Sequence, residues 1–512
     1  MNENVNALPA EGSSQCAQKR ELTGKTNREY RVLLALTLAF CFLLADALGW
    51  PWGMGNSVTV FAWYILLLSA QGRKAMFRRR ESRVLLMVNL ALAASFALTS
   101  NPSFRWWNFL ALAALIPVHA TVELSCRPWW DPRMLAERFK LLFQGLFGNL
   151  WACFAAAVPE RRTEEKPKRT MTVVLGLCGA AALVSILLPV LISADALFAA
   201  SMEKLQWAVL FDFQFGRVFQ RVFWTLVLTP FVFGLLYGLG TPRLLCPVKE
   251  EKGLRVDGLG LALMLAAVDA LYLAFLAVQS AGLFGGPEYL AARGVSYAEW
   301  ARSGFFQMVG VTVVNLSLML AALCLARREG REWTVLRGLC ALLSGESLVL
   351  LVSAAWRMTL YVSAYGLSFK RCMTYWGMMM MALFLLAGLW KTWRPDFRFC
   401  KWAFPLALAG WLVINCVPVD YLVARNQVDR YLSGESPAVS VRYLMYSLSY
   451  DTLPQLERLD GERLLSEYGE AEWRRGETLA GALQQRRLDA QWECADWRSW
   501  SLSACLAAGR RP

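Results

Sequence analysis

Long apolar runs constrain this chain more than any other feature. Each holds roughly 20 mostly uncharged residues, the length that crosses the hydrocarbon core of a bilayer as a helix. About eleven such runs fall at 31–49, 54–70, 83–99, 106–125, 171–193, 222–240, 257–279, 305–326, 335–356, 372–390 and 402–419. They are too long and too uniformly apolar for the alternating strands of a β-barrel. The sequence therefore predicts an all-α, polytopic transmembrane helical bundle over residues 31–419.

The charge balance has to be interpreted together with these runs. Lys and Arg outnumber Asp and Glu by 53 to 39, an excess that in a soluble domain would suggest nucleic-acid binding. Here the positive residues gather in short connectors, such as Arg78, Arg79, Arg80 and Arg83, as orientation charges do. We therefore expect the lipid bilayer as the partner of residues 31–419, and no nucleic acid.

The same charges predict an orientation. Placing the N-terminus in the cytoplasm leaves most connector Lys and Arg on the cytoplasmic side of a bacterial-type inner membrane. Residues 1–30 have no apolar core, so we expect a disordered cytoplasmic segment and no removable signal peptide. An odd number of spans puts residues 420–512 outside the cell as a short helical tail. The prediction is a multi-pass protein of the cell membrane.

Two further apolar stretches, near 141–158 and 197–219, carry their apolar residues at helical spacing. We interpret both as amphipathic helices that lie in the membrane interface. If either one spans instead, every later connector changes sides.

Three polar side chains fall near the middle of consecutive expected spans: Asp269, Asn315 and Glu346. A carboxylate at that depth costs about 2.5–3.5 kcal/mol on insertion scales, so these residues must avoid lipid. One interpretation is a buried polar site for a proton, an ion or a headgroup. The other is a set of interhelical hydrogen bonds that only hold the bundle together.

Other signals are weaker. Gly234 and Gly238 form a GxxxG pair that permits close helix approach. His119, the only histidine, precedes Glu123 by one helical turn, and a hydrated structural pair is favoured over a proton relay. No P-loop, HExxH or CxxC motif occurs, so we expect no metal, no cofactor and no enzymatic activity.

Arg357 closes the span at 335–356, and Tyr361 and Tyr365 continue its helical face. An arginine there can extend outward and stack on the rings as an interfacial anchor. It can also contact an anion or a lipid headgroup.

Two segments carry a family resemblance. Residues 296–306 read SYAEWARSGFF and residues 357–371 read RMTLYVSAYGLSFKR, with an apolar span between them. Together they resemble the bacterial membrane family catalogued as domain of unknown function 4173, which is similar to family 4153. The resemblance covers roughly residues 190–450. It implies a multispan membrane protein and brings no activity.

The resemblance also groups residues into a candidate outer-leaflet site, because both segments border external connectors. Its members are Tyr297, Glu299, Arg302, Arg357, Tyr361, Tyr365 and Arg371.

Three functions remain open. The first is a non-enzymatic sensing or scaffolding protein whose external tail binds a protein partner. The second is a transporter or permease that uses Asp269, Asn315 and Glu346. The third, least favoured, is a membrane enzyme with Glu299 or Glu346 as acid or base. If the tail lies outside, Cys494 and Cys505 are candidates for a disulfide.

Overall fold

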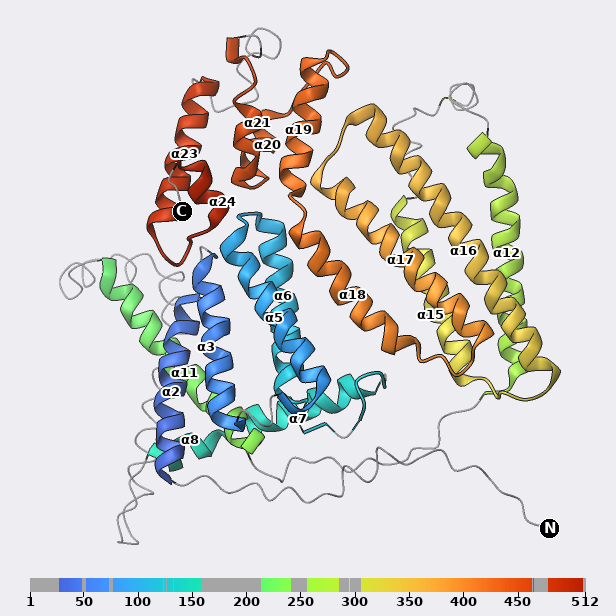
Figure 1. Cartoon of the computed structure of the whole chain (residues 1–512). Helices are drawn as coiled ribbons and strands as arrows, with labels where there is room; N and C mark the ends of the chain where they lie inside the picture. The colour runs from blue at the N-terminus through green and yellow to red at the C-terminus, as the bar shows by residue number, and fades with distance from the viewer. Residues whose placement is uncertain are drawn as a thin grey trace, which may run out of the picture. The chain divides into compact units, whose positions relative to one another are not determined.

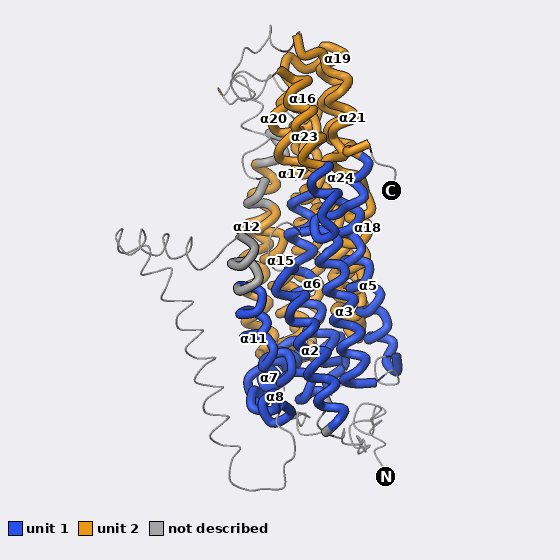
Figure 2. Tube along the Cα trace, turned by 90° about the vertical axis from the view of Figure 1, so that its left-hand side faces the viewer, with its two compact units in different colours: residues 1–248, 491–506, 511–512 blue, residues 249–490, 507–510 orange. Residues whose placement is uncertain are grey.

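The structure is a computed structural model that describes residues 27–47, 52–72, 77–157 except 123, 126 and 132, 213–240, 256–284, 294, 305–462, 464 and 478–509. Within these residues the named elements are all helices, and the only β pairing is an isolated bridge between Val256 and Ala326 (Figure 1). The chain forms two compact units. Unit 1 comprises residues 1–248, 491–506 and 511–512, and unit 2 comprises residues 249–490 and 507–510 (Figure 2).

Unit 1 is a helical bundle. Its helices are α2 (Asn27–Ala47), α3 (Met54–Gln71), α5 (Arg80–Leu98), α6 (Pro102–Ala120), α7 (Met134–Gly148), α8 (Leu150–Ala157), α11 (Phe213–Gly240) and α24 (Leu502–Ala507). Helix α3 packs on both α2 and α5, α6 packs on α5, and α11 packs on α2, α7 and α8.

In its described residues, unit 2 contains five long helices and a set of short ones. The long helices are α12 (Gly258–Phe284), α15 (Phe305–Leu325), α16 (Gly330–Tyr365), α17 (Phe369–Trp393) and α18 (Phe399–Cys416). The short elements are α19 (Val419–Leu432), α20 (Val441–Tyr446), η2 (Tyr450–Thr452), α21 (Leu453–Leu456) and α23 (Leu479–Ala495), whose last turn belongs to unit 1. Helix α16 is central, since α12, α15 and α17 all pack against it.

The expected multispan helical fold is confirmed. By length and composition, seven described helices are able to cross a membrane, or eight if the bent pair α7 and α8 crosses as one span. Ten of the expected runs coincide with described helices, and the run at 171–193 lies outside the described residues. The number of spans and their orientation stay predictions.

The stretch near 141–158 is divided between α7 and α8, which meet at an angle of 42°. Gly234 of α11 explains how closely these elements approach: a Cβ added there would lie 3.2 Å from the Asn149 carbonyl oxygen at the bend and 3.3 Å from that of Gly145. The interfacial position of this pair stays a prediction. Most of the second stretch, 197–219, lies outside the described residues, although α11 already begins at Phe213.

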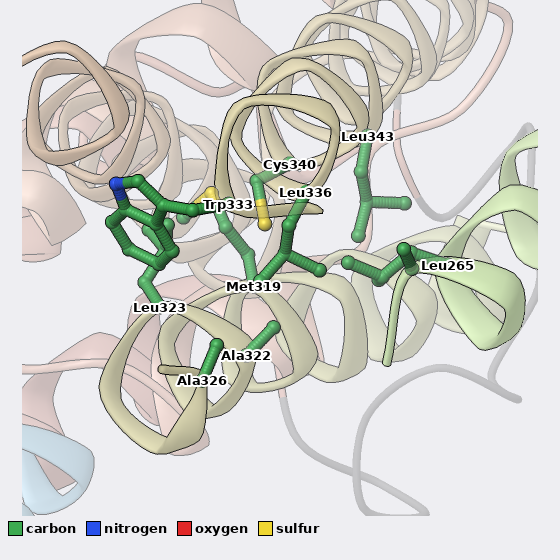
Figure 3. Packing of buried hydrophobic residues seen from close by; sticks show 10 residues of the cluster. Leu265, Met319, Ala322, Leu323, Ala326, Trp333, Leu336, Cys340 and Leu343 are labelled. Carbon is green, nitrogen blue, oxygen red and sulfur yellow. The ribbon is translucent and has the colours of Figure 1, made fainter. Parts of the chain in front are cut away.

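One hydrophobic core of unit 2 joins α12, α15 and α16. Leu265, Met319 and Leu336 are at most 1% exposed, and small residues such as Ala322 let the helices approach (Figure 3). Lipid tails are as apolar as leucine, so close packing rather than escape from water holds such helices together. The large apolar side chains on the outer faces, including Leu271 and Val352, are exposed and free to contact lipid.

The last residues of unit 1 pack on the start of α3. The backbone amides of Met54 and Gly55 donate to the carbonyl oxygens of Trp500 and Arg498, each at 3.0 Å. These bonds satisfy amides that have no partner inside the helix. Cys494 and Cys505 form a disulfide with a Cα–Cα distance of 5.4 Å.

Candidate functional site

The three midplane residues predicted from the sequence converge at the contact of α12, α15 and α16, where Asp269, Asn315 and Glu346 are all buried. Asn315 Nδ2 donates to Ser347 Oγ at 2.9 Å, and the Tyr272 hydroxyl donates to Asn315 Oδ1 at 2.9 Å. We call these five residues the midplane layer. Sequence reasoning missed Tyr272 and Ser347, although Tyr272 follows Asp269 by three residues, a spacing that shares a helix face.

The two carboxyl groups of the midplane layer differ from its other polar groups. Asp269 is 2% exposed and Glu346 is 4% exposed, and none of their four oxygens has a hydrogen-bond partner among the described residues. Burying two unpaired negative charges costs several kcal/mol or more. Protonation of the carboxyl groups, or a bound cation, removes most of that cost.

The candidate outer-leaflet site is only partly visible. Tyr297, Glu299 and Arg302 lie outside the described residues, so their meeting with Arg357 stays a prediction. Arg357 is 6% exposed, which does not fit a side chain that extends outward to anchor the helix. Arg371 stacks on an aromatic ring in this region, with its guanidinium carbon 4.2 Å from the ring centre of Tyr361.

Two arginines hold the carboxyl end of α16. Arg371 Nη1 donates to the carbonyl oxygens of Tyr365, at 3.0 Å, and of Gly366. Arg430 of α19 donates to the carbonyl oxygens of Val362, at 3.1 Å, and of Ala364, at 3.3 Å. The carbonyl groups at a helix end carry partial negative charge and lack intrahelical partners, so cations stabilise them.

The turn between α16 and α17 is held by side chains of α19 and α20. The amide of Leu367 donates to Asn426 Oδ1 at 2.8 Å, and Gln427 Nε2 donates to the Leu367 carbonyl oxygen at 2.6 Å. The amide of Phe369 donates to the Tyr443 hydroxyl at 3.0 Å. Gly366 adopts φ +73°, a left-handed conformation that favours glycine at the end of a helix.

These elements line an open pocket of about 410 Å³, which we call the junction pocket. Side chains from α17, α19, α20 and the segment before α20 line it, including Arg371, Gln427, Arg430, Ser440 and Tyr443. Burial raises the pKa of the Tyr443 hydroxyl above its ordinary value, so the hydroxyl keeps its proton at neutral pH. The sequence had pointed to part of this pocket through the segment 357–371, which carries the family resemblance and contains Arg371.

Unit 1 holds a separate polar network around His119. The Tyr64 hydroxyl lies 3.0 Å from Nδ1 and the Ser82 hydroxyl 2.8 Å from Nε2. Asn89 Nδ2 donates to the Tyr64 hydroxyl at 2.7 Å, which leaves that hydroxyl free to donate to Nδ1. The arrangement suits a neutral imidazole that donates from Nε2. Glu123, the expected partner, lies outside the described residues.

Comparison with known proteins gives one match. The family model described as domain of unknown function DUF4153 matches residues 86–459. The chain belongs to this family. The sequence pointed to family 4173 with 4153 as its relative, and the match is to the relative, so membership of 4173 is unconfirmed. No curated protein and no solved structure matches the chain.

The matched region contains both candidate sites. The midplane layer and the junction pocket fall between residues 86 and 459, whereas the disulfide lies outside this range. Among the residues that the structure describes, no group of three or more His, Cys, Asp or Glu is arranged to hold a metal ion.

Proposed function

We propose that this multispan membrane protein is non-enzymatic and that it senses a ligand, or binds a protein partner, where its carboxyl-terminal helices meet its spans. The observation that carries this proposal is the set of hydrogen bonds from α19 and α20 to the main chain of the α16–α17 turn. These bonds connect α19 directly to the backbone of the turn. Any ligand or partner that displaces α19 should therefore also displace the turn.

Helix α16 is suited to carry such a displacement inward. It runs without a break over 36 residues, from Gly330 to Tyr365. At 1.5 Å per residue this is about 54 Å, well beyond the roughly 30 Å of a hydrocarbon core. The same helix contributes Glu346 and Ser347 to the midplane layer. A shift at its carboxyl end therefore reaches buried polar groups through one rigid element.

The composition of the junction pocket supports a binding role over a catalytic one. The described residues that line it include no His, Cys, Asp or Glu, which are the usual general bases and strong nucleophiles. What the lining offers is hydrogen-bond donors in fixed positions, and this is what recognition requires.

The test separates α19 from the turn. Asn426→Ala combined with Gln427→Ala removes both side-chain bonds to Leu367. Losing two bonds worth about 0.5–1.5 kcal/mol each should speed hydrogen exchange at residues 362–372 roughly tenfold. In a host strain lacking the chain, the double variant should fail to restore the lost phenotype.

The matched control is Arg425→Ala on the same helix, which removes only a surface ion pair with Asp429 at 3.6 Å. It should leave both exchange and phenotype unchanged. The proposal is wrong if the double variant exchanges faster and still restores the phenotype in full.

A second candidate function is movement of protons or small cations across the membrane. The observation that favours it is the buried, unpaired pair Asp269 and Glu346. An intramembrane ionisable residue marks an ion or proton pathway more often than a structural contact.

Proteoliposomes with a trapped pH-sensitive dye test this candidate. If this candidate is right, wild-type liposomes should dissipate an imposed proton or sodium gradient. Asp269→Asn or Glu346→Gln should abolish the flux. Glu332→Gln, an exposed acid on α16, is the control. If wild-type liposomes are as tight as empty ones, the second candidate fails and the sensing proposal is unaffected.

A further inference from the structure

The side chains that line the junction pocket carry an excess of positive charge, although the buried carboxyl group of Asp420, outside the lining, acts on Tyr443. Two of its lining side chains, Arg371 and Arg430, are guanidinium groups, and the described residues that line it include no carboxylate. Among the described residues, Arg430 pairs with Glu435, whose Oε2 lies 4.0 Å from Nε and whose side chain is 66% exposed. An acid this exposed, at this distance, neutralises little of the charge of Arg430. The pocket therefore favours an anion.

The donors of the pocket are only partly used. Arg371 donates through Nη1 to the end of α16, while its Nε and Nη2 make no hydrogen bond within the described residues. The Tyr443 hydroxyl accepts from the Phe369 amide, so its own proton remains to be donated. The Ser440 hydroxyl likewise has no hydrogen bond in the described part of the chain. Three side chains, one on α17 and two at the start of α20, can thus donate to one ligand.

The number and kind of donors select the anion. A guanidinium edge offers two parallel N–H groups that match the spacing of phosphate or carboxylate oxygens. The additional hydroxyl donors suit a group with a third and fourth oxygen, which a phosphate has and a carboxylate lacks. The cavity of about 410 Å³ also leaves room for what the phosphate is attached to.

The position along α16 is consistent with this ligand. Tyr365 and Gly366 lie beyond the expected span at 335–356, where a helix leaves the hydrocarbon and meets the headgroup layer. Phosphate groups of lipids and phosphate-bearing solutes both reach this depth.

We infer that the junction pocket binds a phosphate group, carried by a lipid headgroup or by a free anion. This inference rests on the proposed function, because it names the chemistry of the ligand that acts at the same junction.

The experiment measures binding to the purified full chain in a neutral detergent. The probes are inorganic phosphate, dioctanoyl phosphatidic acid, and dioctanoylglycerol, which differs from the second only by the phosphate. Sodium chloride at equal ionic strength controls for general screening. We expect phosphatidic acid or inorganic phosphate to raise the melting temperature in a saturable way, and dioctanoylglycerol and chloride to have no such effect.

Three variants locate the site. Arg371→Gln should weaken the apparent affinity roughly tenfold or more, as expected for a lost charge-assisted bond. Ser440→Ala should weaken the apparent affinity several-fold. The Ser440 hydroxyl makes no capping hydrogen bond to α20, so this variant should fold and tests the inference even if Arg371→Gln does not fold. Arg425→Gln removes the same charge from the outer surface of α19 and should bind like wild type.

Each outcome decides the inference. Binding of phosphatidic acid alone identifies a lipid headgroup, and binding of inorganic phosphate identifies a free anion; either supports it when Ser440→Ala weakens binding and Arg425→Gln does not. The inference is overturned if no phosphate probe binds, or if Arg371→Gln and Ser440→Ala bind like wild type. If a phosphate probe binds but hydrogen exchange at residues 362–372 does not change, the sensing proposal is wrong and the phosphate inference stands. If the double variant of Asn426 and Gln427 loses the phenotype but no phosphate probe binds to the wild type, the phosphate inference is wrong and the sensing proposal stands.

Discussion

Buried polar side chains in this protein are of two kinds. Asn315 and His119 sit in hydrogen-bond networks that use both sides of the amide or ring. Asp269 and Glu346 are equally buried, yet their oxygens have no hydrogen-bond partner within the described residues. Interhelical hydrogen bonds inside membranes contribute only about 0.6 kcal/mol each on average, so the first kind fixes helix register more than stability. The second kind is costly and calls for a ligand or a proton.

A residue-level prediction concerns Asp496 in the tail. Arg498 donates to both of its carboxylate oxygens, from Nε at 3.0 Å and from Nη2 at 2.7 Å, and this bonding lowers the pKa of Asp496 below its usual value. The stabilisation is therefore complete above the unfolded pKa of about 3.9 and is lost as the pH falls through the lower folded value. Thermal unfolding between about pH 5 and 3 should show this loss.

Asp496→Asn should be less stable at neutral pH and should show a shallower acid dependence than the wild type. Asp489→Asn, which removes a half-buried acid on α23 that, among the described residues, accepts only from Gln485, is the control and should keep the wild-type slope. An unchanged slope in Asp496→Asn would mean that the pair contributes nothing to stability.

At the scale of elements, glycines mark where helices or loops come closest. Gly234 lets α11 approach the bend between α7 and α8, as the GxxxG pair suggested. Gly53 has a similar role that the sequence did not reveal. A Cβ at this position would lie 2.5 Å from the backbone carbon and oxygen of Ser499. Backbone atoms cannot move aside as a flexible side chain can, so only glycine fits there.

Gly53→Ala should therefore disturb the contact between the start of α3 and residues 498–500. Overpacking of this kind typically costs about 1–3 kcal/mol. Thermal unfolding of the purified chain should report the loss, and limited proteolysis should cleave residues 496–509 sooner. Gly148→Ala is the control, since nothing lies within 4 Å of an added Cβ at that site. Equal stability of the two variants would contradict this packing.

At the scale of the whole molecule, the charge distribution and the disulfide bear on the same question of orientation. Lys and Arg in the connectors predict a cytoplasmic N-terminus and an external tail. The structure pairs Cys494 with Cys505 in that tail, and disulfides persist in oxidising compartments. The two arguments are independent, because one depends on the connectors between spans and the other on geometry at the end of the chain.

We expect Cys494 and Cys505 to resist alkylation in intact cells until a reductant is added. Cys494→Ser should leave Cys505 unpaired and should lower the free energy of unfolding by about 2–4 kcal/mol. A protease added outside should remove a tag placed after residue 512 but not one placed before residue 1. If the protease removed only the tag before residue 1, the orientation would be the opposite of the predicted one.

The sequence by itself determined the class of fold, because hydrocarbon is a solvent with one strict demand: each span must satisfy its own backbone, and only long apolar helices do so. The same demand made Asp269, Asn315 and Glu346 conspicuous, since polar groups at that depth are costly.

Only the tertiary structure decided which groups meet. The bonds from Asn426 and Gln427 to Leu367 join positions about 60 residues apart in the chain. No periodicity or local propensity encodes such a contact, which depends on how helices pack. For the same reason, the sequence placed Arg357 against the tyrosines, whereas packing turned it inward and put Arg371 over Tyr361.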